Sequence, residues 1–370
     1  MKKLVCSAAA LIAASCAGSV MAQSSVTVYG LIDTGVEYIT NSNTAGNSVV
    51  KMPSLTGSYP SRLGFKGSED LGGGLQAMFV LEAGFLVDTG GMNQGNRLFG
   101  RQSFVGLKNE QNTVMLGRQI NMTYVASLKS DVIGPSIYSM GSLDAYLPNA
   151  RSDNAIGYMG NYLDNTVTVG ATYSFGRDTS TAGGPSATGC AGEVAGNAAT
   201  CRQYTGLIGY DNKTYGVNVA YDKMNGGAGS YYSGGGVISA TSSSSTDRRV
   251  GVHAYVMFGD IKLGGGLINR QTMTSTNTVS NLSYLGVSYP LSVALVADAQ
   301  VLRLSFNGTS NTTNLGVLRL TYNLSKRTAL YTILGHVTNS GKDAVSAEAG
   351  GSVNAGQAQS GIMTGIRHTF

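Results

Sequence analysis

Polar and apolar residues alternate along most of this chain with the two-residue period of a β-strand, and no helical segment covers the resulting apolar faces. The hairpin from Pro60 to Phe85 shows the pattern clearly. In its first arm Leu63 and Phe65 share one face, while Arg62 and Lys66 share the other. After a turn rich in acids and glycine, the second arm places a row of apolar residues opposite Glu82. Each arm therefore presents one apolar and one charged face.

The same alternation recurs to the end of the chain and predicts about sixteen strands. Besides the hairpin, the clearest runs are residues 26–40, 97–107, 113–118, 166–175, 204–210, 215–221, 250–258, 261–270, 282–288, 293–306, 314–322, 329–337 and 360–370. Tight turns alternate with long polar loops at residues 176–202, 223–247 and 339–357.

An extended sheet without covering helices is typical of a closed barrel in a membrane. Every backbone N–H and C=O in hydrocarbon must be paired, so a sheet that enters lipid cannot keep an edge. Short turns at one end, long loops at the other and an even strand count are features of outer-membrane barrels. We therefore predict an all-β fold, a transmembrane antiparallel β-barrel with short periplasmic turns and long external loops. Side chains cannot fill a barrel of this strand number, so the lumen should hold water.

One long segment, residues 119–150, lacks clean alternation. Long irregular segments in compact proteins are usually functional or disordered, and its Ile, Met, Tyr and Leu content argues against disorder. We interpret it as a constriction loop. If it folds inward, its acids Asp131 and Asp144 face the cations of the front half across a narrowed waist.

Charges at lumen-facing positions of the front half are mostly basic. In the run 97–107 we place Arg101 on the polar face with Ser103 and Val105, opposite Phe104. Arg118 ends its strand, so its face stays open. The candidate pore-constriction residues are Arg62, Lys66, Glu82, Arg101, Arg118, Asp131, Asp144 and Arg151. Together they would set up a transverse field that sorts solutes. The alternative for any one of them is a solvated charge or a structural ion pair.

The chain begins with the three parts of a secretory signal: a basic start, an apolar run and a small-residue cleavage site. We predict a signal peptide at residues 1–22 and a mature barrel domain at residues 23–370, with lipoprotein processing at Cys16 as the alternative. The mature cysteines are then Cys190 and Cys201. An even pair at short separation in an exported protein predicts a disulfide, two free thiols being the alternative.

Composition supports an extended membrane fold and argues against several other functions. The chain has 52 Gly and 20 Tyr but only 6 Pro and no Trp, and charged residues make up 12%. The formal net charge of +5 falls further when Lys2 and Lys3 leave with the signal, which is too weak to suggest nucleic-acid binding. No nucleophile elbow, P-loop or HExxH motif is present. We expect no enzymatic activity, cofactor or metal.

Four stretches carry a family resemblance: VTVYGLIDTGV, SRLGFKGSEDLGGGLQAMFVLEAGF, RLFGRQSFVGL with LGRQ, and the terminal GIRHTF. As a set they resemble the general diffusion porins of Gram-negative bacteria, most of all the beta-proteobacterial branch. The resemblance implies a sixteen-stranded homotrimer whose third external loop folds into each pore. It also implies that Arg62 and Arg101 belong to the basic wall of the pore, with Lys66 and Glu82 nearby. Asp131 and Asp144 match the acidic side by place only, since the acidic loop tip of enterobacterial relatives is missing.

The expected partners follow from the same resemblance. The terminal Phe370 resembles the signal that the barrel assembly machinery reads, and the surroundings are outer-membrane lipid and lipopolysaccharide. We expect passive diffusion of small hydrophilic solutes and ions, with a mild anion preference because Arg62, Lys66, Arg101 and Arg151 outnumber the acids. A substrate-selective porin with saturable flux is one alternative. An outer-membrane enzyme or adhesin barrel and a soluble lectin-like sandwich are others.

Overall fold

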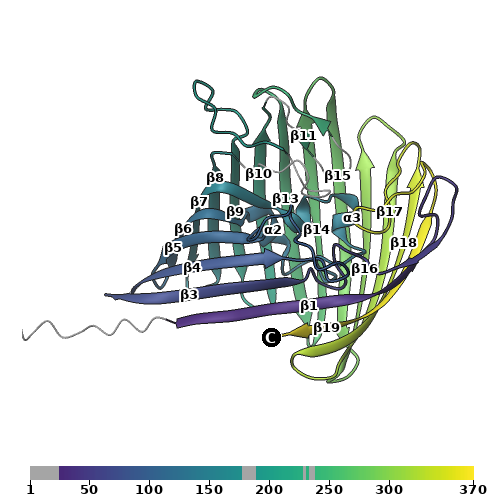
Figure 1. The fold of residues 1–370 in the computed structure, drawn as a ribbon, viewed down its shortest axis with the longest axis horizontal. Helices are drawn as coiled ribbons and strands as arrows, with labels where there is room; N and C mark the ends of the chain where they lie inside the picture. Colours follow the sequence, from purple (N-terminus) through teal and green to yellow (C-terminus); the bar gives the residue numbers. More distant parts are fainter. Residues whose placement is uncertain (1–24, 177–188, 228–230, 233–237) are drawn as a thin grey trace, which may run out of the picture.

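A computed structural model describes residues 25–176, 189–227, 231–232 and 238–370. The expected signal peptide at residues 1–22 lies outside the described residues. Figure 1 shows strands that wrap around in chain order, with α2 (Met122–Ser127) and α3 (Met140–Leu143) among them. Among the described residues, no helix is long and apolar enough to cross a membrane.

The main sheet has seventeen strands, of which the three-residue β2 (Val49–Lys51) is a loop segment paired to β1, so sixteen strands form the barrel. The barrel strands are β1 (Ser25–Ile39), β3 (Arg62–Gly72), β4 (Leu75–Gly84), β5 (Gln102–Lys108), β6 (Asn112–Ile120), β7 (Arg151–Tyr162), β8 (Val167–Ser174), β9 (Gln203–Asp211), β10 (Tyr215–Asn225), β13 (Thr246–Phe258), β14 (Ile261–Met273), β15 (Asn277–Pro290), β16 (Leu295–Phe306), β17 (Thr312–Asn323), β18 (Thr328–Ser340) and β19 (Gln359–Thr369). The remaining elements are the 3-10 helix η1 (Leu147–Asn149) and the small hairpin β11 (Tyr231–Tyr232) and β12 (Ile238–Ser239).

The barrel closes between its first and last strands. β1 pairs antiparallel with β19 on one side and with β3 on the other, as the side-by-side ribbons in Figure 1 show. At the seam the backbones of Gly30 and Phe370 exchange two hydrogen bonds of 3.1 Å. This closure leaves no unpaired edge and confirms the predicted sixteen-stranded barrel.

Short connections and longer loops alternate along the chain. The turns at one end are residues 73–74, 109–111, 163–166, 212–214, 259–260, 291–294 and 324–327. At the other end the described connections are residues 40–61, 85–101, 121–150, 274–276, 307–311 and 341–358, with 175–176 and 189–202 after β8 and 226–227 and 240–245 after β10; most of them are longer than the turns. Short turns face the periplasm in outer-membrane barrels, so the loop end is the external end. The strand β7 is one that the alternation pattern does not reveal.

The two faces of the strands are sorted as expected for a water-filled barrel in lipid. In β1, Val28, Ile32 and Val36 are exposed on the outer surface, while Asp33 and Glu37 are buried inside. The outer row meets lipid and the inner row meets the lumen or the loops that fold into it.

The expected faces are wrong for one strand. In β5, Phe104 is buried on the lumen side and Val105 is exposed outside, the reverse of the prediction. Arg101 still reaches the lumen because it precedes β5 and lies in a loop, where strand alternation does not apply. Its backbone N–H donates to the carbonyl of Glu82 at 3.0 Å, which brings its side chain to the inner wall.

Candidate pore constriction

Residues 121–150, the third external loop, fold into the barrel, as predicted; we call them the inward loop. The first two residues of the expected segment 119–150 belong instead to β6. The Asn121 side chain caps α2 by accepting the N–H of Thr123 at 3.2 Å. Met122 and Ala126 of α2 then pack in one apolar cluster with residues of β9 and β10.

The tip of the inward loop is fastened to β16 and β17. Arg319 of β17 donates to the carbonyls of Ile133 at 2.7 Å and Val132 at 2.9 Å, and its Nε binds Asp298 at 2.9 Å. The side-chain oxygen of Gln300 accepts the N–H of Val132 at 3.1 Å. A buried cation therefore holds two loop carbonyls that would otherwise lack donors.

The second half of the loop lies against β18, β19 and β1. Tyr138 is fully buried and donates its hydroxyl to Glu37 at 2.6 Å. Its ring lies over Gly335 and Gly361, where a Cβ would approach ring or hydroxyl atoms to 2.5 Å and 2.1 Å. The two glycines allow the loop to approach the wall closely.

Asp144 does not face the arginines of the front wall, so that part of the prediction is wrong. Its carboxylate binds Arg249 of β13, which donates from Nε at 3.0 Å and Nη2 at 2.8 Å. Arg249 is 1% exposed, pairs also with Asp247 at 3.1 Å and stacks on Tyr146 at 4.6 Å. Asp144 thus anchors the loop to the opposite wall.

The anchors named above lie mainly on β9, β10, β13, β16 to β19 and β1, and the basic residues of the front half lie on or beside β3 to β7. On that wall Arg62 of β3 and Arg101 share the carboxylate of Glu82 on β4. The Nε of Arg101 lies 2.6 Å from Glu82 Oε1, and the Nε of Arg62 lies 4.0 Å from Oε2. The hydroxyl of Tyr29 donates to the same Oε2 at 2.9 Å. One carboxylate therefore serves two guanidinium groups.

A bulge decides the face of Arg118. Strict alternation would place it outside with Leu116, but the β6 register shifts next to Gly117, whose φ of +128° favours glycine. The Arg118 side chain instead donates from Nε to the carbonyl of Gly100 at 2.7 Å and forms an ion pair with Asp153. The bulge adds a cation to the lumen side.

Arg151 is the most unusual member of this wall. It is 6% exposed, and among the residues that the structure describes no carboxylate pairs with it and its Nε has no hydrogen-bond partner. It interacts electrostatically with Arg101 and Arg118. A buried guanidinium among like charges is complementary to an anion.

Asp131 is half-buried and lies beside Gln300 and Arg319 rather than against the arginines of the front wall. Its Oδ1 accepts from Gln300 at 2.9 Å and from the N–H of Gly134 at 3.1 Å. Burial raises the pKa of its carboxyl, and these hydrogen bonds oppose the shift. The loop residue that faces the arginines is Tyr124, which interacts electrostatically with Arg62, Arg101 and Arg151 and whose own pKa is raised, mainly by burial.

Sequence reasoning missed Tyr124, Asp153 and Arg97. No pattern in the irregular loop marks Tyr124. Asp153 could have been found, because it shares a strand face with Arg151 at a spacing of two. Arg97 lies in the loop 85–101, before β5, and its Nη1 lies 3.3 Å from Asp153 Oδ2. Lys66 lies further toward the periplasmic end, over the ring of Tyr29 at 5.4 Å.

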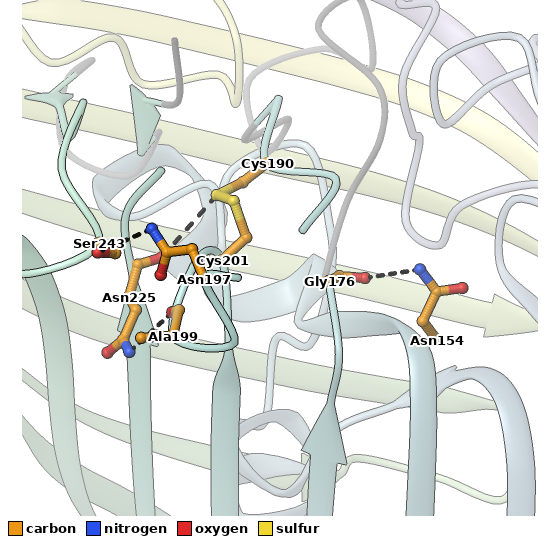
Figure 2. Close-up of a disulfide and its surroundings, with 8 residues drawn as sticks. All are labelled: Asn154, Gly176, Cys190, Asn197, Ala199, Cys201, Asn225 and Ser243. Carbon is orange, nitrogen blue, oxygen red and sulfur yellow. Dashed lines mark hydrogen bonds between the residues drawn. A yellow bond between two sulfur atoms is a disulfide. The ribbon is translucent and has the colours of Figure 1, made fainter. Parts of the chain in front are cut away.

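The predicted disulfide between Cys190 and Cys201 is confirmed. Figure 2 shows it beside Asn225, in the external loop after β8. The backbone N–H of Cys201 donates to the carbonyl of Gly226 at 2.9 Å, and the side chain of Asn225 donates to Ala199 at 3.1 Å. The bond therefore stiffens a loop that packs on its neighbour.

A closed barrel with an apolar exterior, a polar interior and a loop folded into its lumen defines a transmembrane channel protein. The family model described as Gram-negative porin matches residues 7–342, so the chain belongs to that family. It is an outer-membrane channel through which small hydrophilic solutes and ions diffuse passively.

Similar proteins agree with this family. Outer membrane porin protein 32 of Delftia acidovorans is 32% identical over 382 residues, covering 98% of each chain. An outer-membrane porin protein of Bordetella pertussis is 30% identical over 411 residues, covering 100% of each. The structure of the anion-selective porin from Comamonas acidovorans superposes with a TM-score of 0.76 at 28% identity, covering 94% of this chain and 100% of the other. The family resemblance seen in the sequence motifs is confirmed.

Proposed function

We propose that this porin mildly prefers anions and that Arg62, Lys66, Arg101, Arg118 and Arg151 form its selective wall. The supporting observation is the excess of cations on this wall, where Glu82 and Asp153 are the carboxylates that pair with them among the residues that the structure describes. Each uncompensated charge attracts an anion 4 Å away by about 1 kcal/mol in water. Salt screens this attraction beyond about 8 Å, so the preference arises at the wall and stays mild. The similar Comamonas porin is named as anion-selective.

The unpartnered Nε of Arg151 favours a second candidate, a substrate-selective porin. A buried donor that lacks a partner gains from an anion that accepts its hydrogen bond. Such a channel would show saturable flux for one class of carboxylate or phosphate solute, whereas a general channel shows flux that rises linearly with concentration.

The test is the reversal potential of the purified protein in a planar bilayer under a KCl gradient. We expect large ohmic steps and a potential that favours chloride. Arg62→Gln and Arg151→Gln should each move the reversal potential toward the value expected for a channel that prefers potassium. Arg248→Gln is the matched control, since Arg248 faces outward and pairs with Gln271. Cation preference in the unmodified protein would refute the proposed wall.

Further parts of the proposal concern processing and assembly. Residues 1–22 act as the signal peptide, residues 23–370 form the mature barrel domain, and the chain assembles as a homotrimer without enzymatic activity. Phe370 serves as the signal for the barrel assembly machinery; in the folded barrel its backbone is bonded at the seam, which fits a segment that joins last. N-terminal sequencing and cross-linking of protein from outer membranes test the first two points, and deletion of Phe370 should lower the yield of folded trimer.

A further inference from the structure

Four inner-face residues lie side by side across β10, β13, β14 and β15. In the order of the sheet register they are Asn218, His253, Gly266 and Tyr284. Because Gly266 has no side chain, the imidazole and the phenol meet across β14, and His253 Nδ1 lies 2.8 Å from the Tyr284 hydroxyl. A Cβ at Gly266 would lie 2.8 Å from each of these two atoms. The glycine therefore makes room for a buried pair, with His253 1% and Tyr284 5% exposed.

This row of residues is bonded to the inward loop at the end of α2. The Tyr284 hydroxyl lies 2.6 Å from the hydroxyl of Ser130, which is itself buried. The Asn218 side chain donates to the carbonyl of Ala126 at 3.2 Å. A Cβ at Gly264 would lie 2.1 Å from the carbonyl oxygen of Ser130, so the loop backbone rests directly on β14. The row thus fastens residues 126–130 to the wall.

The number of donors sets the direction of this hydrogen-bond chain. The carbonyl of Ser127 already accepts the N–H of Ser130 at 3.0 Å and the N–H of Asp131 at 2.9 Å, which occupies both of its lone pairs. The Ser130 hydroxyl lies 3.1 Å from that carbonyl and 2.6 Å from Tyr284, so its stronger hydrogen bond goes to Tyr284. The Tyr284 hydroxyl then donates to His253 Nδ1, which must be unprotonated to accept.

A proton on Nδ1 would disturb the chain as far as the loop. Nδ1 would become a donor, the Tyr284 hydroxyl would turn toward Ser130, and the Ser130 proton would be left to the carbonyl of Ser127, which has no lone pair to spare. The imidazolium would also be buried, and its Nε2 has no hydrogen-bond partner among the residues that the structure describes. The arrangement therefore suits neutral imidazole alone.

The surroundings of His253 offer an imidazolium no counter-ion. Its neighbours on β10 and β14, Asn218 and Gly266, carry no charge, and no carboxylate in the described part of the chain pairs with it. The titratable and charged groups around it are already engaged: Tyr284 with Ser130, Tyr255 with Asp211, Arg249 with Asp144 and Asp247, and Asp131 with Gln300 and Gly134.

We propose that neutral His253 positions the inward loop through Tyr284 and Ser130, and that protonation of His253 in acid loosens residues 126–130 and so changes the pore. Histidine ordinarily takes up a proton at about pH 6.5, and the fastening is complete well above that pH. The role of His253 is independent of the ion preference of the pore, because it concerns the place of the loop and not the charge of the front wall.

Single-channel recording in symmetrical KCl, from about pH 7.5 down to about pH 3.5, tests the proposal. The unmodified protein should pass from a quiet to a fluctuating current as the pH falls. His253→Asn keeps a neutral acceptor near the place of Nδ1 and cannot take up the proton, so it should stay quiet throughout. Tyr284→Phe breaks the chain and should fluctuate already at the upper pH, with roughly a tenfold rise in the time spent at the altered level, the effect of losing one buried hydrogen bond.

His336→Asn is the matched control. His336 is exposed on β18, and its Nδ1 lies 2.8 Å from the Ser360 hydroxyl, so the same substitution is made at a histidine far from the loop. It should keep the acid transition of the unmodified protein. Asp131→Asn should keep that transition too, since it changes the reversal potential and leaves the His253 chain intact.

Three results would overturn the proposal. They are an acid transition that persists in His253→Asn, a Tyr284→Phe current as quiet at the upper pH as that of the unmodified protein, and an unmodified channel that stays quiet over the whole range. Loss of the transition in Asp131→Asn would assign it to that carboxyl instead. The reversal potential at the upper pH should be the same in His253→Asn and the unmodified protein, so a failure here is distinct from a failure of the proposed selective wall.

Discussion

Replacement of Arg249 by Met should loosen the inward loop without unfolding the barrel. Arg249 joins Asp144 of the loop to Asp247 of β13 and is 1% exposed. Methionine keeps much of the side-chain volume but removes the charge. Asp247 retains its pair with Arg270 at 2.9 Å, so the loss falls mainly on Asp144.

The expected size follows from the contacts. Removal of one partner from a buried ion pair costs about 3–5 kcal/mol, because the other charge stays buried and unpaired. A loss of about 3 kcal/mol raises the population of the opened loop by roughly a hundredfold. The interstrand hydrogen bonds of the barrel are untouched, so its thermal unfolding should change little.

Single-channel recording in a planar bilayer gives the readout. Arg249→Met should show larger current fluctuations and a shifted mean conductance, since the loop occupies the lumen. Adding Asp144→Asn should restore a quieter channel, because it removes the unpaired buried charge. Arg248→Met is the control, an outward-facing neighbour on the same strand. A current trace for Arg249→Met as quiet as that of the unmodified protein would refute the anchoring role of this ion pair.

Three further predictions concern the pore and its loops. The pKa of the Asp131 carboxyl is raised, so Asp131 gains a proton at a higher pH than an exposed Asp does. The pKa of an exposed Asp is about 3.9. Reversal potentials should therefore move toward chloride as the pH is lowered, and Asp131→Asn should show that shift already at neutral pH and little further change. Gly335→Ala should alter conductance, since its Cβ would lie 2.5 Å from the ring of Tyr138, an overpacking worth about 1–3 kcal/mol; an unchanged conductance would contradict the close approach. Replacing Cys190 and Cys201 by Ser should lower the local stability of the external loop by about 2–3 kcal/mol, so that a protease cleaves the loop more easily while the conductance stays the same. Equal protease resistance of the variant and the unmodified protein would contradict this prediction.

The faces of most strands were predictable because side-chain direction in a strand depends only on position along it. This local rule held for β1 and for the hairpin of β3 and β4, and with the resemblance it yielded the closed barrel. It failed for β5, whose faces were set from Arg101 although residues 97–101 lie in a loop, and at Gly117, where a bulge turns Arg118 inward. Neither a strand boundary nor a bulge is marked by alternation itself.

The sequence by itself determined the barrel, its inner and outer faces, the inward loop and the basic character of the front wall. Tertiary structure alone decided which charges meet. Asp144 was expected opposite the arginines but pairs with Arg249, 105 positions away in the chain, while Tyr124 takes the place facing them. The physical reason is that an irregular loop has no repeat to fix its side chains. Their partners are set by contacts with strands that come together only when the barrel closes.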